Sequence, residues 1–192
     1  MSKRIALFSA AALGVLALTA TVVAPVSAQD KMKSEMSGEK TVMVGGAAMF
    51  PSKNIVQNAV NSKDHTTLVA AVKAAGLVDT LEGKGPFTVF APTNAAFGKL
   101  PAGTVDTLVK PENKATLTKI LTYHVVPGKL EAADLTDGKK LKTVQGEELT
   151  VKRSGDTVMI VDSKGGSSTV TIPNVNQSNG VIHVIDTVLM PS

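Results

Sequence analysis

The sequence contains no cysteine and no tryptophan, and aromatic residues make up only 3% of it. The absence of cysteine excludes disulfide bonds, cysteine-ligated zinc, iron–sulfur clusters and cysteine nucleophiles, and also the residue that carries the lipid of a bacterial lipoprotein. The scarcity of aromatic side chains argues against the stacking platforms that bind single-stranded nucleic acids. We therefore expect an aliphatic core to stabilise the fold by itself.

The familiar motifs of catalysis and nucleotide binding are missing as well. The chain has no G-x-S-x-G, G-x-x-x-x-G-K, G-x-G-x-x-G or H-E-x-x-H motif and no EF-hand loop. Its three histidines, His65, His124 and His183, are too far apart in sequence to form a helical pair of metal ligands. We expect His65 to face solvent and the other two to be core or boundary residues. The sequence thus predicts no enzyme, no cofactor and no metal site.

Residues 1–28 have the pattern of a secretory signal peptide. Lys3 and Arg4 precede an apolar run, and Val26-Ser27-Ala28 supplies small residues at the −3 and −1 positions. We expect cleavage after Ala28, which gives a secreted or periplasmic protein without a permanent membrane anchor. An uncleaved anchor is the alternative, since the run is long enough to span a bilayer. Removal of the peptide lowers the net charge from +4 to +2, too small a balance to indicate a nucleic-acid partner.

The segment 29–50 is expected to be a flexible tail. It is mostly polar and holds four of the seven methionines, so it buries too little apolar surface to offset its ordering entropy. A Cu(I) site built from thioethers is an alternative interpretation. Val42, Val44 and Phe50 are apolar enough to dock onto the domain that follows.

Residues 51–192 are expected to form one α+β domain. Apolar residues recur at helical spacing over residues 51–121, where Thr93 is a candidate N-cap and Gly76 a C-terminal stop. The rest of the chain consists of short runs rich in Val, Ile and Thr, separated by glycines. Helices followed by strands are typical of the α+β class. The last run, residues 181–190, is apolar on both faces and predicts a strand covered on both sides.

Asp186 is a carboxylate within this last apolar run. It needs hydrogen-bond donors, because burying an unpaired charge is costly. It is either a catalytic acid or base, or a clasp that accepts donors from another segment. Since no second carboxylate or histidine is suitably placed, we favour the clasp and expect donors from Thr88, Thr93 or the amides near Asn94. Replacing Asp186 by Asn should then lower the melting temperature.

Two segments of the chain resemble the signature motifs of fasciclin-like domains, namely residues 85–97 and 179–191. A Tyr-His pair, Tyr123 and His124, resembles the motif between them, and residues 67–77 resemble the family's early helix. That helix opens with His65, where many relatives have an aromatic residue. We expect the two signature segments to pair as neighbouring core strands. The motif residues expected to maintain the fold are Phe87, Thr88, Phe90, Pro92, Thr93, Asn94, Phe97, Gly180, His183 and Asp186.

The resemblance implies a β-sandwich or wedge with helices packed around it, and a secreted or cell-surface protein that is not an enzyme. It implies adhesion or recognition, with an extracellular or envelope protein or a glycan as the partner. Tyr123 and His124 inherit a role in that interaction. The alternative is a carrier of an apolar small molecule such as a carotenoid, as in some relatives from photosynthetic organisms. The chain has one copy of the domain, whereas adhesion proteins often carry several. A single copy cannot bridge two surfaces in the way that repeated copies can.

Overall fold

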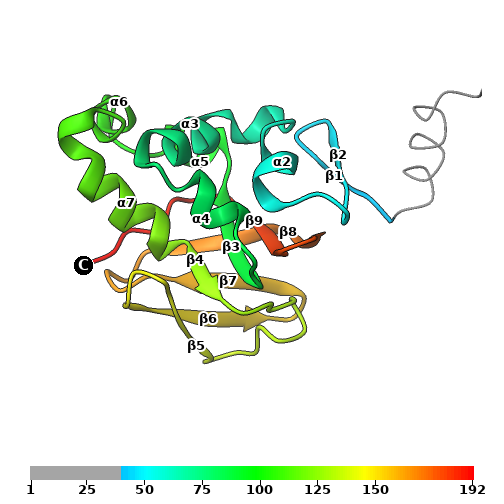
Figure 1. Cartoon of the computed structure of the whole chain (residues 1–192). Helices are drawn as coiled ribbons and strands as arrows, with labels where there is room; N and C mark the ends of the chain where they lie inside the picture. The colour runs from blue at the N-terminus through cyan, green and yellow to red at the C-terminus, as the bar shows by residue number, and fades with distance from the viewer. Residues whose placement is uncertain (1–39) are drawn as a thin grey trace, which may run out of the picture.

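The computed structural model describes residues 40–192. The predicted signal peptide at 1–28 and the first half of the predicted tail, residues 29–39, lie outside the described residues. The described chain has two layers, a set of short helices and a curled seven-stranded sheet (Figure 1). None of the helices in residues 40–192 has the length and apolar character that a membrane span requires.

The helices come mainly from the first half of the described chain, as the periodicity predicts. Thr93 caps one of them, because its hydroxyl oxygen accepts a hydrogen bond from the Ala96 amide at 3.2 Å. The helices are α2 (Ile55–Ala59), α3 (Thr66–Ala75), α4 (Val78–Glu82), α5 (Asn94–Gly98), α6 (Thr104–Leu108) and α7 (Lys114–Tyr123), with 3-10 turns η1 (Lys63–His65) and η2 (Pro111–Asn113).

The main sheet runs in the order β4-β3-β9-β8-β7-β6-β5. Its strands are β3 (Phe87–Pro92), β4 (Val125–Pro127), β5 (Lys140–Lys142), β6 (Glu148–Ser154), β7 (Thr157–Val161), β8 (Ser167–Gln177) and β9 (Gly180–Ile185). The two signature segments supply β3 and β9, which pair in parallel with Phe90 opposite His183. Every residue of β9 is buried, so the predictions of neighbouring core strands and of a strand covered on both sides are confirmed.

Gly180 begins β9 at a point where the two signature strands approach closely. A Cβ atom there would overlap the backbone carbonyl of Phe87. Only glycine allows this approach, which explains the residue without a functional role.

The predicted tail is wrong for residues 42–49, which form a hairpin of β1 (Val42–Val44) and β2 (Ala47–Met49). Val44 and Met49 are buried in the core, and the Gly45 carbonyl accepts a hydrogen bond from the Lys63 amide. The physical reason is that apolar residues alternate on either side of Gly45-Gly46, two glycines with positive φ that suit a hairpin turn. The ordered domain therefore includes residues that the sequence analysis assigned to the tail.

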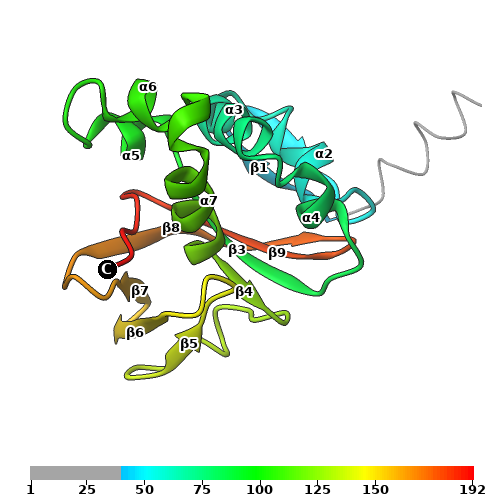
Figure 2. The same ribbon diagram turned by 60° about the vertical axis from the view of Figure 1, so that its left-hand side comes forward.

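The sheet divides the interior into two cores. The helix-side core lies between the helices and strands β3, β9 and β8. The sheet-side core lies within the curl, which is tightened where Val144 and Gln145 donate to the carbonyls of Val125 and Thr122. Figure 2 shows the β5–β7 end of the sheet curving away from the helices. The sheet-side core consists of Phe90, Tyr123, Val126, Leu135, Leu141, Leu149, Val151, Val158, Ile160, Ile185 and Leu189.

Candidate ligand pocket and polar groove

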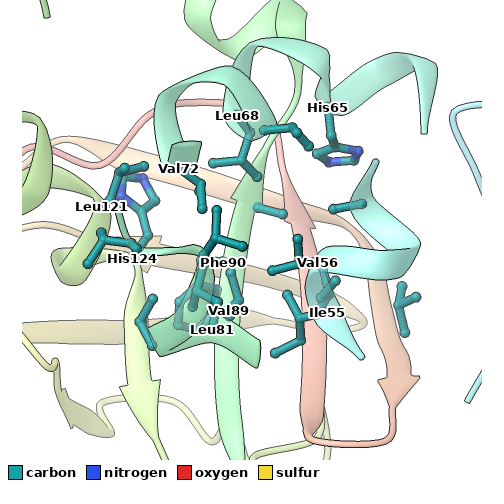
Figure 3. A pocket seen from close by; sticks show the side chains of 18 of the residues that line it. Ile55, Val56, His65, Leu68, Val72, Leu81, Val89, Phe90, Leu121 and His124 are labelled. Atoms are coloured by element: carbon teal, nitrogen blue, oxygen red, sulfur yellow. The ribbon is translucent and has the colours of Figure 1, made fainter. Parts of the chain in front are cut away.

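An apolar cavity of about 50 Å³ lies in the helix-side core, between α2, α3 and α4 on one side and β3 and β9 on the other (Figure 3). Short side chains such as Val56, Ala59 and Val72 line much of it, so the facing layers do not fill the space between them. The volume exceeds what one water molecule needs, but an apolar lining does not hold water well. This cavity, called the pocket below, is a candidate binding site for an apolar molecule.

The pocket comes nearest to solvent between the helices. Ala59, Val69, Leu77 and Val78 line it and are only half-buried, and Lys73 is exposed. These residues belong to α2, α3, α4 and the α3–α4 connection. A ligand would therefore enter from the helical layer, and the Lys73 side chain lies at the entrance.

His65 lines the pocket and is only 3% exposed, so the prediction that it faces solvent is wrong. It stands at the end of η1 rather than in the first turn of a regular helix, and this turns the ring inward. The amide of Asn94 holds the turn in place, because its oxygen accepts from the Thr67 amide at 3.0 Å and its NH2 group donates to the Lys63 carbonyl at 2.8 Å. Asn94 thus connects the first signature segment to the wall of the pocket.

The His65 ring uses one of its two nitrogens. Nδ1 shares a hydrogen bond of 2.9 Å with the Ser62 hydroxyl, whereas Nε2 is buried and has no hydrogen-bond partner. Burial lowers the pKa of His65, although the Asp64 carboxylate and the nearby Ala91 carbonyl act to raise it; the contact with Ala91 does not reach the geometry of a hydrogen bond. The ring is therefore neutral at neutral pH.

The predicted interaction pair, Tyr123 and His124, is buried in the interior. The Tyr123 hydroxyl donates to the Glu148 carbonyl at 3.3 Å and accepts from the Ser163 amide at 2.9 Å. A partner cannot contact these two side chains in this structure, so the prediction of a direct interaction role is wrong. The sequence did not show that the surrounding strands enclose both residues.

The hydrogen bonds of His124 fix its tautomer. Its Nδ1 donates to the Ile120 carbonyl at 2.8 Å, because a carbonyl only accepts, and its Nε2 accepts from the Leu189 amide at 3.0 Å. Burial lowers the pKa of His124 to about 4, despite the opposing Ile120 carbonyl and Asp162 carboxylate. His124 ties α7 to the segment that follows β9, which is a structural role.

His183 and Thr88 fasten the loop after β4 to the two signature strands. His183 Nε2 donates to the Leu130 carbonyl at 2.8 Å, and the ring stacks on Phe90 with centroids 5.7 Å apart. The Thr88 hydroxyl donates to the Gly128 carbonyl at 2.6 Å and accepts from the Leu130 amide at 2.9 Å. Phe90 packs in the sheet-side core, and Phe87 and Phe97 pack in the helix-side core. Pro92 is buried at the end of β3, opposite Ile185.

Asp186 forms a clasp, but its donors differ from those expected. Its carboxylate accepts from the Thr169 amide at 2.8 Å and from the Ser168 and Thr187 hydroxyls, and Lys99 lies 3.4 Å away. Burial acts to raise the pKa of Asp186, but the Thr169 amide, the Thr187 hydroxyl and Lys99 together lower it. The donors come from β8 and its own neighbour because β9 pairs with β8 at this end.

A second hollow, the polar groove, is open to solvent where β3 and β9 begin. The sequence analysis missed the residue that builds it, Asn179. Its amide donates to the carbonyls of Leu81 at 2.7 Å and Gly83 at 3.1 Å, and accepts from the Ile55 amide at 3.1 Å. Polar residues around the groove include Asn54, Gln57, Glu82, Lys84, Lys129 and Ser178.

Among residues 40–192 no group of three or more His, Cys, Asp or Glu side chains is placed to hold a metal ion.

Comparison with known proteins places this architecture in a family. The chain is 51% identical to protein sll1483 of Synechocystis sp., over 80% of this chain and 82% of that protein. It is 37% identical to the immunogenic protein MPB70 of Mycobacterium bovis over 100% of this chain and 98% of that protein, and 40% identical to the cell surface glycolipoprotein MPB83 of the same species over 77% and 64%.

A solved structure shows the same fold. It is a FAS1 domain pair from the insect cell adhesion molecule fasciclin I, with a TM-score of 0.65 and 20% sequence identity. The match covers 73% of this chain and 52% of that two-domain chain. Proteins of this kind are generally non-enzymatic and often belong to cell surfaces. The family model described as "Fasciclin domain" matches residues 63–191, and the chain belongs to the fasciclin domain family.

Proposed function

We propose that this protein acts outside the cytoplasm as a non-enzymatic recognition domain whose partner is an extracellular or envelope protein or a surface glycan. The signal-peptide pattern of residues 1–28 supports the location, as does a relative that is named a cell surface glycolipoprotein. The observation that carries the proposal is the polar groove, because it presents side-chain amides and charges of both signs together.

The groove is held in a fixed shape by side-chain hydrogen bonds to the backbone. Asn179 ties three segments together at its base, and the capping box of α2 uses the amide oxygens of Asn54 and Gln57. The side-chain NH2 groups of Asn54 and Gln57 can therefore donate hydrogen bonds to a partner, and the exposed Lys84 lines the same groove. A rigid set of donors suits hydroxyl and carbonyl oxygens, which both glycans and peptide backbones offer.

The test is capture of a partner from native envelope fractions by the purified protein. We expect Lys84→Glu in the groove to reduce capture, and the matched exposed change Lys152→Glu on β6 to leave it unchanged. Digestion of the fractions with protease, or oxidation with periodate, separates a protein partner from a glycan. Equal capture by both variants, or none by the unmodified protein across salt concentrations, would contradict the proposal.

The pocket favours a second candidate function, transport or storage of an apolar small molecule such as a carotenoid. Its lining is apolar apart from His65, His124 and the exposed Lys73. Because the cavity of about 50 Å³ is small, a long ligand needs the half-buried residues between α2, α3 and α4 to move apart. Such binding gains free energy from the apolar surface that leaves water.

Purification from the native host, followed by absorbance and mass spectrometry, tests this candidate. A bound carotenoid gives visible colour, and any other lipid appears in an organic extract. Val72→Phe, which fills the pocket, should abolish co-purification, whereas Val144→Phe at an exposed position should not. A colourless and lipid-free preparation would remove this function.

A further inference from the structure

We infer that the pocket takes a neutral apolar molecule with one hydroxyl or carbonyl oxygen, and that His65 Nε2 forms a hydrogen bond with that oxygen. This inference rests on the proposed ligand-binding function of the pocket and adds the chemical class of the ligand. It starts from a buried polar atom that the protein itself leaves without a partner.

His65 Nε2 is one of two buried side-chain polar atoms in residues 40–192 that lack a hydrogen-bond partner, and the other, Asn176 Oδ1, does not line the pocket. An unpaired polar atom in an apolar interior costs free energy, so proteins rarely leave one without a reason. His124 also lines the pocket, but both of its nitrogens are used by backbone groups. Within the pocket, His65 is therefore the buried side chain that can recognise a polar group on a ligand.

The position of His65 fits this role. The ring lies at the start of α3 on the side of the pocket, beyond Leu68, while Ile55, Val56 and Leu81 surround the lower part of the cavity (Figure 3). A ligand larger than the cavity of about 50 Å³ needs the half-buried residues between α2, α3 and α4 to move apart, as do the two probes used below, and it then has its apolar body among apolar side chains and one end near the ring. The ring is held by the Ser62 hydroxyl at 2.9 Å and follows a turn fixed by Asn94.

The chemistry of the ring selects the ligand's polar group. If Nδ1 accepts from Ser62, Nε2 carries the proton and donates to a hydroxyl or carbonyl oxygen. If Nδ1 donates to Ser62, Nε2 accepts from a hydroxyl. An alcohol satisfies both tautomers, and a ketone satisfies one. A carboxylate fits neither well, because a neutral ring in apolar surroundings does not compensate a buried charge.

The experiment compares 1-hexanol with heptane, two chains of similar length that differ by a hydroxyl in place of a methyl group. Their affinities are measured for the unmodified protein, His65→Leu and, as a pocket control, Val72→Phe. We expect the ratio of hexanol affinity to heptane affinity to fall about 3- to 10-fold in His65→Leu, which is the range for one lost hydrogen bond. Val72→Phe should weaken both probes together.

Nitrogen NMR of the imidazole gives a readout that does not need a variant, and it decides the question if His65→Leu fails to fold. Hexanol should shift the Nε2 resonance of His65, and heptane should leave it nearly unchanged. An unchanged affinity ratio, or tighter binding of hexanoate than of hexanol, would overturn the inference while the pocket remains a binding site. Failure of both hexanol and heptane to bind the unmodified protein would instead overturn the proposed ligand-binding function, and the inference with it.

Discussion

The two cores of this domain differ in how completely they are packed. In the sheet-side core, Leu149, Val151 and Ile160 have no exposed surface, and the polar group of Tyr123 is hydrogen-bonded. The helix-side core contains the cavity of about 50 Å³ and the unpaired Nε2 of His65. The comparison indicates that the sheet-side core contributes most to stability. The helix-side core is packed less completely, and the space left open there is the candidate ligand pocket. The two signature strands, β3 and β9, contribute side chains to both cores and so connect them.

Truncation of one leucine in each core should show the largest difference. We expect Leu149→Ala to lower the free energy of unfolding by about 3–5 kcal/mol, because a fully packed site cannot collapse around the void. Leu68→Ala, beside the pocket, should cost about 2–3 kcal/mol, since Leu68 already has fewer neighbouring atoms to lose. Urea denaturation measures the free energy of unfolding of both variants, and equal slopes of free energy against urea concentration make the two values comparable. Equal losses would contradict the distinction between the cores.

Acid should weaken the fold through its buried histidines. The folded state holds His124 neutral, with a pKa of about 4, whereas the unfolded chain protonates it below about 6.5. The unfolded state therefore binds more protons between these two pH values, and stability falls as the pH is lowered through this window. The difference between these two pKa values corresponds to about 3 kcal/mol in the free energy of unfolding, which is lost in full once the pH is below both values.

His65 and His183 act in the same direction, because burial lowers the pKa of each. Urea unfolding at a series of pH values from 7.5 to about 4 would measure the effect. His124→Gln should show a shallower pH dependence, whatever its stability at pH 7.5. A slope equal to that of the unmodified protein would show that His124 is not the group responsible.

Replacing one histidine in each core compares a satisfied ring with an unsatisfied one. His183→Leu should cost about 2 kcal/mol, because the Leu130 carbonyl loses its donor and Phe90 loses its stacking partner. His65→Leu should cost about 1 kcal/mol or less, since it removes an unpaired buried nitrogen at the same time as it frees the Ser62 hydroxyl. Thermal unfolding at pH 7.5 ranks the two variants, and the reverse order would contradict the assignment of His65 to the site.

A similarly small effect is expected at the partly exposed clasp formed by Asp186. Asp186→Asn should lower the free energy of unfolding by about 1 kcal/mol, which corresponds to a fall of about 2–4 °C in melting temperature. Glu148→Gln is the matched control, because that carboxylate pairs with exposed Lys140 at 3.4 Å and such pairs contribute little. If both variants melt at the same temperature as the unmodified protein, Asp186 is not a clasp.

Much of the fold could be predicted from local patterns. Thr157–Val161, one of the short runs rich in Val, Ile and Thr, forms a strand, Thr93 caps its helix, and the two signature segments pair. The hairpin at 42–49 was not predicted, because alternation over so few residues, interrupted by Gly45-Gly46, is a weak signal beside the polar segment before it. The bounds of β9, Gly180–Ile185, also differ from the predicted run at 181–190, since pairing with the neighbouring strands decides where a ladder ends.

The candidate site was less predictable. Most lining residues of the pocket are ordinary apolar core residues in sequence, and a cavity arises only from how the layers fit together. His65 is expected to face solvent if it lies in the first turn of a helix, but the η1 turn and Asn94, which is 29 positions further along the chain, rotate it inward. Tyr123 was placed at an interface because family motifs show which residues matter, without showing which way they face.

The sequence by itself determined the class of the fold, the family and the aliphatic nature of its cores, because periodicity, turn residues and motif order are local properties of the chain. Only the tertiary structure decided which motif residues are buried, which donors Asp186 finds, and where packing is incomplete. Those features depend on contacts between segments far apart in sequence, such as Asn94 with Lys63 and Asn179 with Ile55. The unpaired nitrogen of His65 is of this kind, since only the assembled layers give it apolar surroundings and no partner.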